Sequence, residues 1–254
     1  SHDIRTPMNA IVGMTAIAAA HIDDRKQVEN CLRKITLSSK HLLGLINDVL
    51  DMSKIESGKL TLTTEQISLK EVVEGIVNIM QPQVKTKKQT FDIHVENILT
   101  ENVWCDGVRL NQVLLNLLSN ATKYTPEGGS IHLSLFEENS PKGERYVRIY
   151  IKVKDNGIGM SPDFLKRIYE SYSRADETRI HKTEGAGLGM AITKYIVDAM
   201  EGTIDIQSEP DKGTEFLLTF DFEKAAAMNM DMVLPSWNML VVDDDELLCR
   251  TSMD

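Results

Sequence analysis

The sequence predicts an α-helical hairpin that forms a dimeric four-helix bundle, followed by an α+β sandwich with helices on one face of a mixed sheet. Apolar and small residues recur every three or four positions from Ile4 to Ser53, which is the period of a helix face. After residues 56–60 the period changes to two, as in half-buried strands, and helical patterns separate the alternating segments. A short helical domain is therefore expected to precede a larger mixed one.

The hairpin is predicted from two stripes with the same spacing. The first stripe covers residues 4–22 in steps of 4, 3, 4, 3 and 4, and the second covers residues 28–53. Polar residues 21–27 between them indicate a turn. Additional leucines widen the second stripe beyond what one partner helix covers: Leu43, Leu45 and Leu50. Two copies are therefore expected to pair; the alternative is a hairpin that packs on the C-terminal domain of its own chain.

The mixed domain is predicted from alternating segments with helical patterns between them. The strand candidates are 60–64, 90–96, 130–137, 145–155, 202–209 and 213–222. The helix candidates are 68–87, 107–124, 162–172 and 187–200. The Met-rich stretch at 224–237 indicates a linker, and a new domain is expected to begin at 238.

Composition excludes several classes of protein. The net charge of −10 and the pI of about 5.1 argue against nucleic-acid binding, which needs a basic face. Three scattered cysteines, Cys31, Cys105 and Cys249, predict neither a disulfide framework nor a zinc site, and a reducing cytosol fits them best. The longest apolar run, residues 10–20, is too short to span a bilayer. A membrane anchor upstream of Ser1 is left open.

The helix predicted over 107–124 carries a polar pattern on a leucine-rich background. Asn116 and Asn120 lie one turn apart, and Lys123 and Tyr124 follow on the next turn. Buried amides are costly without partners, and a Mg²⁺-nucleotide would supply them, because an amide oxygen can bind the cation and a lysine can meet phosphate. The alternative is that both asparagines cap or bridge helices.

Two glycine-containing motifs follow. Asp155, Gly157 and Gly159 come directly after a strand, where glycine allows a sharp turn close to a planar ligand and the carboxylate can accept from an exocyclic amine. The alternative is a common strand-to-loop turn. Later glycines open a helix, where backbone N–H groups favour phosphate: Gly185, Gly187 and Gly189. The polar loop 171–184 before them suits a lid over phosphates.

The order of these motifs resembles the Bergerat-fold ATPases, and the stretch SHDIRTPMN resembles the H box of the histidine kinases. The resemblance covers residues 1–222. It implies a dimerisation and histidine phosphotransfer hairpin at 1–58, an ATP-binding domain at 59–223, a linker at 224–237 and a receiver stub at 238–254. In that stub Asp243 and Asp244 resemble the paired acids of a receiver domain, so the parent protein is expected to be a hybrid kinase.

The resemblance also implies roles for the first helix. His2 would take the γ-phosphate of ATP, while Asp3 would orient the imidazole. Thr6, one turn from His2, would orient water for phosphatase activity; a hydroxyl bonded to its own helix is the alternative. Pro7 cannot donate to the carbonyl of Asp3 and is expected to loosen the helix around His2. Arg174, in a segment resembling the family's phenylalanine box but with tyrosines at 169 and 172, would reach the γ-phosphate.

On the nucleotide side, the resemblance implies that Asn120 binds Mg²⁺ and Asn116 its hydration shell. Lys123 would contact phosphate and Tyr124 the nucleoside, while Asp155 would accept from adenine N6. Thr214 would support that carboxylate. The expected activity is autophosphorylation of His2 from Mg-ATP and transfer to an aspartate of a receiver domain. A Bergerat-fold ATPase without histidine transfer and a pseudokinase scaffold are the alternatives.

Overall fold

The computed structural model describes residues 2–171, 173 and 187–225, with the backbone alone for His2. These residues form two compact units. The first holds residues 2–60 with the described residues between 169 and 192, and the second holds residues 61–168 and 193–225. Arg174, Gly185 and the predicted receiver stub lie outside the described residues.

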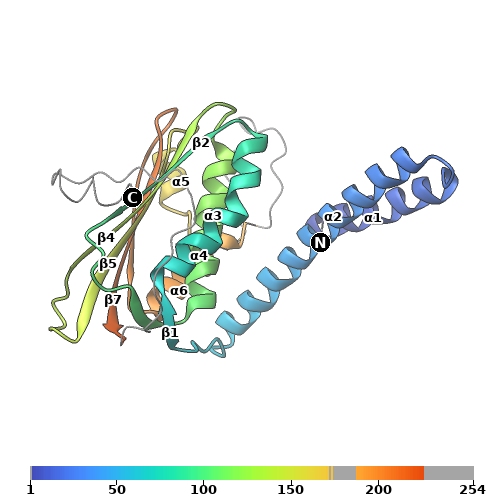
Figure 1. Ribbon diagram of the computed structural model, residues 1–254. Helices are drawn as coiled ribbons and strands as arrows, with labels where there is room; N and C mark the ends of the chain where they lie inside the picture. The colour runs from blue at the N-terminus through green and yellow to red at the C-terminus, as the bar shows by residue number, and fades with distance from the viewer. Residues whose placement is uncertain (1, 172, 174–186, 226–254) are drawn as a thin grey trace. The chain divides into compact units, whose positions relative to one another are not determined.

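The predicted helical hairpin is confirmed. It consists of α1 (His2–Ala20) and α2 (Arg25–Glu56), which lie side by side in Figure 1. Asp24 caps α2, because its side chain accepts from the backbone N–H of Gln27 at 3.1 Å. At the other end Gly58 has a φ of +64°, so the chain leaves the helix through a left-handed residue.

The hairpin leaves much of its apolar surface exposed. Leu45 is 4% exposed, whereas Leu43 and Leu50 remain 60% and 54% exposed. The exposed large apolar residues of the hairpin are Ile4, Met8, Val12, Ile17, Ile22, Leu32, Leu37, Leu43, Ile46, Val49 and Leu50. So many exposed apolar side chains on one helical hairpin are typical of a surface that another protein covers. None of the described helices combines the length and hydropathy that a bilayer crossing requires.

The second unit is built on a mixed seven-stranded sheet in the order β1-β3-β7-β5-β4-β2, with β6 paired to β7. The strands are β1 (Glu65–Ser68), β2 (Thr90–Glu96), β3 (Asn102–Cys105), β4 (Ser130–Asn139), β5 (Tyr146–Asp155), β6 (Thr203–Glu209) and β7 (Gly213–Lys224). β2 and β4 are parallel, and the other pairs are antiparallel. The predicted mixed sheet is confirmed.

Helices cover one face of this sheet, as predicted (Figure 1). They are α3 (Leu69–Thr86), α4 (Gly107–Tyr124) and α6 (Gly189–Ala199). Alternate residues of the strands point toward them, so that Leu133 and Ile149 are fully buried along with Leu114 and Leu117 of α4. The core between sheet and helices therefore holds α4 against the central strands.

The strand predicted at 60–64 is wrong, although its alternation is that of a strand. Residues 61–64 lie outside regular structure, and the backbone N–H of Thr63 donates to the Asp106 side chain at 2.8 Å instead of to a neighbouring strand. The observed strand, β1, begins at Glu65, just after the predicted one ends, and it pairs with β3, which the sequence reasoning also missed. Both strands are short, with four residues each.

The helix predicted at 162–172 is shorter than expected. α5 covers only Pro162–Leu165, with Ser161 as its cap. From there the backbone bonds span three residues, as in the 3.0 Å bond from Arg167 N to Phe164 O. The chain therefore continues as tight turns, which bury Ile168.

Leu117→Ala should destabilise the protein by about 3 kcal/mol, because it removes a fully buried side chain from the interface between α4 and the sheet. Urea unfolding measures the change. Leu99→Ala is the matched control, since Leu99 is 91% exposed and its loss should cost less than about 0.5 kcal/mol. Equal effects of the two substitutions would contradict the core described above.

Candidate functional site

α4 presents two faces with different chemistry. Its N-terminus is capped by Asp106, which accepts from Arg109 N at 3.0 Å. The leucines and valine of one face are fully buried: Leu110, Val113, Leu114, Leu117 and Leu118. The polar residues predicted for the site lie half-buried on the adjoining face: Asn116, Asn120, Lys123 and Tyr124. Burial of the apolar face thus fixes the direction in which the polar residues point.

The two asparagines form a short chain of hydrogen bonds. Asn116 Nδ2 donates to Thr193 Oγ1 of α6 at 2.8 Å, and Asn120 Nδ2 approaches Asn116 Oδ1 at 3.5 Å. Asn116 therefore bridges two helices, as one of the alternatives predicted. In this arrangement the amide nitrogen of Asn120 faces Asn116, which turns its oxygen away from that neighbour.

Lys123 and Tyr124 lie together at the last turn of α4. The ammonium of Lys123 is 5.0 Å from the centroid of the Tyr124 ring. That separation is within the range of a cation–π contact. The structure therefore places a positive charge beside an aromatic ring at the helix end, a combination that suits a ligand with a phosphate and a base.

Asp155 ends β5 as a buried acid, with 7% of its surface exposed. It accepts from the backbone N–H of Gly157 at 2.8 Å and from the backbone N–H of Thr214. Burial raises the pKa of the Asp155 carboxyl above its ordinary value, against the opposing effect of these two donors. The side chain is held in one orientation as an acceptor.

The glycines around Asp155 make close contacts with protein backbone, and their approach to a planar ligand stays a prediction. A Cβ on Gly157 would lie 2.6 Å from the carbonyl oxygen of Tyr124. A Cβ on Gly159, which has a φ of +60°, would lie 1.9 Å from the carbonyl oxygen of Glu209. Gly213 similarly packs against the backbone of Asp155. These glycines thus allow the loop after β5 to pack against the loop between β6 and β7.

Ser208, at the end of β6, is a site residue that sequence reasoning missed. Its hydroxyl accepts from Met160 N at 2.9 Å, donates to Gly213 O at 3.0 Å and lies 2.9 Å from Thr214 Oγ1. Because the Ser208 hydroxyl donates its hydrogen to the Gly213 carbonyl, it accepts a hydrogen bond from the Thr214 hydroxyl. Thr214 supports Asp155 through its own backbone N–H, while its side chain is oriented by Ser208.

The helix predicted after the last glycine motif is α6, which begins at Gly189. Gly187 has a φ of +70°, so a left-handed residue precedes the helix. The first N–H groups of a helix have no partner within it and favour anions. The predicted phosphate role of this helix start is compatible with its geometry.

The hairpin carries the remaining predicted residues. His2 is the first residue of α1, Asp3 is half-buried, and Thr6 is exposed one turn after His2. Pro7 lies inside the helix and is buried. The expected loosening of the helix at Pro7 stays a prediction.

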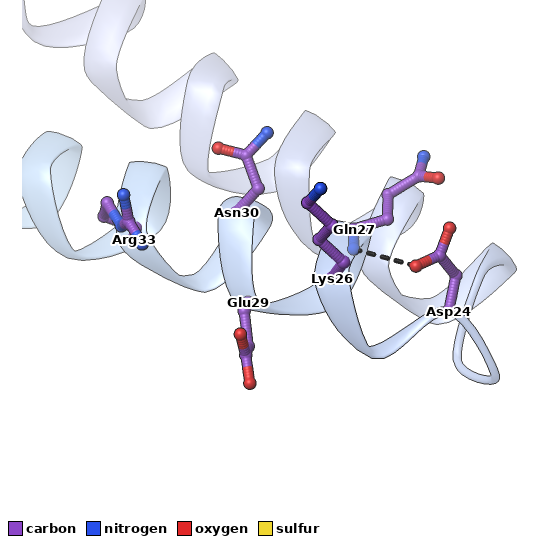
Figure 2. Close-up of a pocket in the computed structure, with 6 residues that line it drawn as sticks. All are labelled: Asp24, Lys26, Gln27, Glu29, Asn30 and Arg33. Atoms are coloured by element: carbon purple, nitrogen blue, oxygen red, sulfur yellow. Dashed lines mark hydrogen bonds between the residues drawn. The ribbon is translucent and has the colours of Figure 1, made fainter.

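Two of the surface hollows among the described residues do not include the α4 asparagines. The larger, of about 550 Å³, lies at the hairpin turn and is lined by Asp24, Lys26, Gln27, Glu29, Asn30 and Arg33 (Figure 2). The second, of about 210 Å³, includes Asp155 and Thr214 but also Lys154 and Glu215, which alternate to the opposite sheet face.

Two known protein families match this chain, one over the second unit and one over the hairpin. The family described as histidine kinase-, DNA gyrase B- and HSP90-like ATPase matches residues 105–224, and the His Kinase A (phospho-acceptor) domain matches residues 1–58. The chain belongs to the histidine kinases. The resemblance seen in the order of the motifs is thus confirmed, as are the histidine-kinase hairpin and ATPase folds.

Curated sensor kinases are similar in sequence to most of this chain. The autoinducer 2 sensor kinase/phosphatase LuxQ of Vibrio vulnificus is 36% identical over 224 residues, which are 88% of this chain and 26% of that protein. The sensor histidine kinase GacS of Pseudomonas protegens is 34% identical over 88% of this chain and 24% of its own length. This histidine kinase chain thus spans about a quarter of the length of these relatives.

Solved histidine kinases share the fold. The crystal structure of full-length ShkA in complex with AMPPNP has a TM-score of 0.66 at 29% identity, over 89% of this chain and 45% of that one. The histidine kinase AdeS of Acinetobacter baumannii has a TM-score of 0.61 at 22% identity, over 87% of this chain and 97% of that one. The second likeness concerns the fold alone.

Lowering the pH should stabilise the nucleotide-free histidine kinase relative to Asp155→Asn. Because the folded pKa of Asp155 is raised above 3.8, the folded state takes up a proton before the unfolded chain does. This contribution is fully present below the unfolded pKa and is lost as the pH rises through the folded pKa. The melting-temperature difference, wild type minus variant, should therefore grow as the pH falls from neutral toward the ordinary value of 3.8. A constant difference would contradict the raised pKa.

Gly159→Ala should destabilise the kinase domain by about 2–4 kcal/mol, because the new Cβ would overlap the Glu209 carbonyl at a left-handed residue. Gly75→Ala is the matched control: it lies in α3 with no atom within 4 Å and should be neutral or stabilising by about 0.5–1 kcal/mol. Urea unfolding compares them. Similar curves for both variants would show that the two loops have room to separate.

Proposed function

We propose that this histidine kinase core phosphorylates its own His2 from Mg-ATP and passes the phosphoryl group to an aspartate of a receiver domain. The observation that carries the proposal is the combination of a buried acceptor, Asp155, with the amide, ammonium and ring on the last turns of α4. They lie in a domain of the ATPase family, and His2 opens a hairpin of the phospho-acceptor family.

The nucleotide roles follow from the chemistry of each side chain. Asp155 would accept from the amino group of adenine, with Thr214 supporting its carboxylate. Tyr124 would pack on the nucleoside, and Lys123 would bind phosphate as a point charge. Gly187 and Gly189 would bring the first N–H groups of α6 close to phosphate. The roles proposed for Arg174 at the γ-phosphate and for Gly185 concern residues outside the described part of the chain.

Asn120 is the proposed ligand of Mg²⁺, with Asn116 in the hydration shell. An amide oxygen is a suitable donor for a hard cation, and the Asn120 amide is oriented by its bond toward Asn116. Within the described part of the chain no three His, Cys, Asp or Glu side chains group to hold a metal. The other ligands would therefore come from phosphate oxygens and water. When bound, Mg²⁺ supplies neutralisation of phosphate charge.

The transfer itself needs a neutral imidazole. A nitrogen lone pair of His2 would form the N–P bond to the γ-phosphorus, and the bond to the bridging oxygen would break, so that ADP leaves with its electron pair. Asp3 would accept from the other ring N–H and stabilise the developing positive charge. The α1 helix carries both residues on consecutive positions.

We propose that the chain divides into the hairpin at 1–58, the ATP-binding domain at 59–223, a linker at 224–237 and the beginning of a receiver domain at 238–254. The exposed apolar face of α1 and α2 supports a homodimer through the hairpin. The name of LuxQ includes a phosphatase, which supports Thr6 as a candidate for that activity. The cytosol supplies ATP and is the proposed location.

His2→Gln should abolish covalent labelling of the protein by ATP radiolabelled at the γ-phosphate. Wild-type label should be stable to alkali and labile to acid, as a phosphorylated histidine requires. His41→Gln is the matched control, because His41 lies on α2 of the same hairpin, and it should label normally.

Three outcomes would contradict the proposal. ATP hydrolysis without protein label would favour an ATPase of the same fold that lacks histidine transfer. Failure of the wild type to bind Mg-ATP at millimolar nucleotide would favour a pseudokinase scaffold. Label that persists in His2→Gln would place the acceptor elsewhere.

A further inference from the structure

The C-terminal end of α4 is bonded by two side chains that follow α3. Lys87 Nζ donates to the carbonyl of Thr122 at 2.7 Å and to the carbonyl of Lys123 at 3.0 Å. Gln89 Nε2 donates to the carbonyls of Thr122 at 3.1 Å and Thr125 at 2.7 Å. The last carbonyls of a helix have no partner within it, so these side chains supply the missing donors.

The turn after α3 explains how both side chains reach the same place. Lys88, between them, has a φ of +52°, which turns the chain sharply at the helix end. Gln89 is only 8% exposed, so its amide is built into the interior. Lys88 instead pairs with Glu127 at 2.6 Å, and both of these side chains are largely exposed.

The loop that carries Asp155 is bonded to the same end of α4. Ile158 N donates to the carbonyl of Tyr124 at 3.2 Å, and Gly157 packs against that carbonyl. The turn that carries Lys123 and Tyr124 is therefore held from two directions, by the segment after α3 and by the loop after β5.

Electrostatics favour the ammonium at this position. The C-terminus of a helix carries partial negative charge, and a cation bonded to its carbonyls forms charge-assisted hydrogen bonds. Removing the donors would leave buried carbonyls without partners, which costs more than the bonds themselves contribute. The last turn would then move to find other donors, and Lys123 and Tyr124 would move with it.

We propose that Lys87 and Gln89 are positioning residues of the nucleotide site. They hold the last turn of α4 so that Lys123 and Tyr124 stand at a fixed place relative to Asp155, and they thereby set nucleotide affinity. The inference rests on the proposed function, because it assigns these three residues to nucleotide. Lys87 and Gln89 act through the helix end that they cap.

Lys87→Met should raise the dissociation constant for a non-hydrolysable Mg-ATP analogue by about 5- to 10-fold, measured by calorimetry well below the melting temperature. Lys88→Met is the matched control, since it removes the same charge one residue away but only an exposed ion pair. Its dissociation constant should stay within about twofold of wild type. Hydrogen exchange of residues 121–129 should accelerate in Lys87→Met alone.

Further variants separate positioning from general stability. Lys87→Arg should restore affinity to within about twofold, because a guanidinium can also bond two carbonyls. Gln89→Leu should weaken binding as Lys87→Met does; should it fail to fold, the lysine pair still decides. In Lys87→Met the KM for ATP should rise, while labelling at saturating ATP stays near wild type.

The outcomes distinguish the inference from the proposed function. A wild type that binds no Mg-nucleotide overturns both. A wild type that binds, with equal affinities for Lys87→Met and Lys88→Met, overturns the inference alone. A lower melting temperature of Lys87→Met without a change in affinity or in KM also overturns it, since the lysine would then serve stability only.

Discussion

Two loop backbones meet beside the end of β5 with no space for a side chain between them. Gly159 lies against the carbonyl of Glu209, and Gly213 against the backbone of Asp155. This contact determines how deeply the Asp155 carboxylate is buried and from which backbone N–H groups it accepts hydrogen bonds. The pKa of that acid and its fixed direction as an acceptor both follow from it.

α4 connects the loop after Asp155 to the polar residues of the site. Its buried leucines fix the rotation of the helix against the sheet, and its last turn is bonded to the loop after Asp155. A helix with 3.6 residues per turn then places Asn116 and Asn120 above one another, with Lys123 and Tyr124 next to them. The amides, the ammonium and the aromatic ring of the site are thus all held by one helix, α4.

The sequence was sufficient for features that depend on neighbouring residues. The hairpin, the α4 pattern and the acid after β5 all arise from short periodic or turn-forming stretches, and each element was predicted close to its bounds. Contacts between residues far apart in the sequence could not be predicted in this way. Ser208 accepts from Met160, and Lys87 and Gln89 donate to the end of α4; these partners lie 33 to 48 residues away, so no local pattern indicates them. The misplaced strand at 60–64 has the same cause, since Asp106 takes the N–H of Thr63 that a strand would use.

The buried carboxylate of Asp155 also determines which base the proposed pocket would accept. Adenine presents an amino group at its sixth position, whereas guanine presents a carbonyl oxygen there. An ionised carboxylate can only accept, so guanine would bring two acceptors face to face where little water can separate them. Guanine nucleotides would be rejected by repulsion rather than by size. Adenine nucleotides alone would then serve as phosphoryl donors in the proposed reaction.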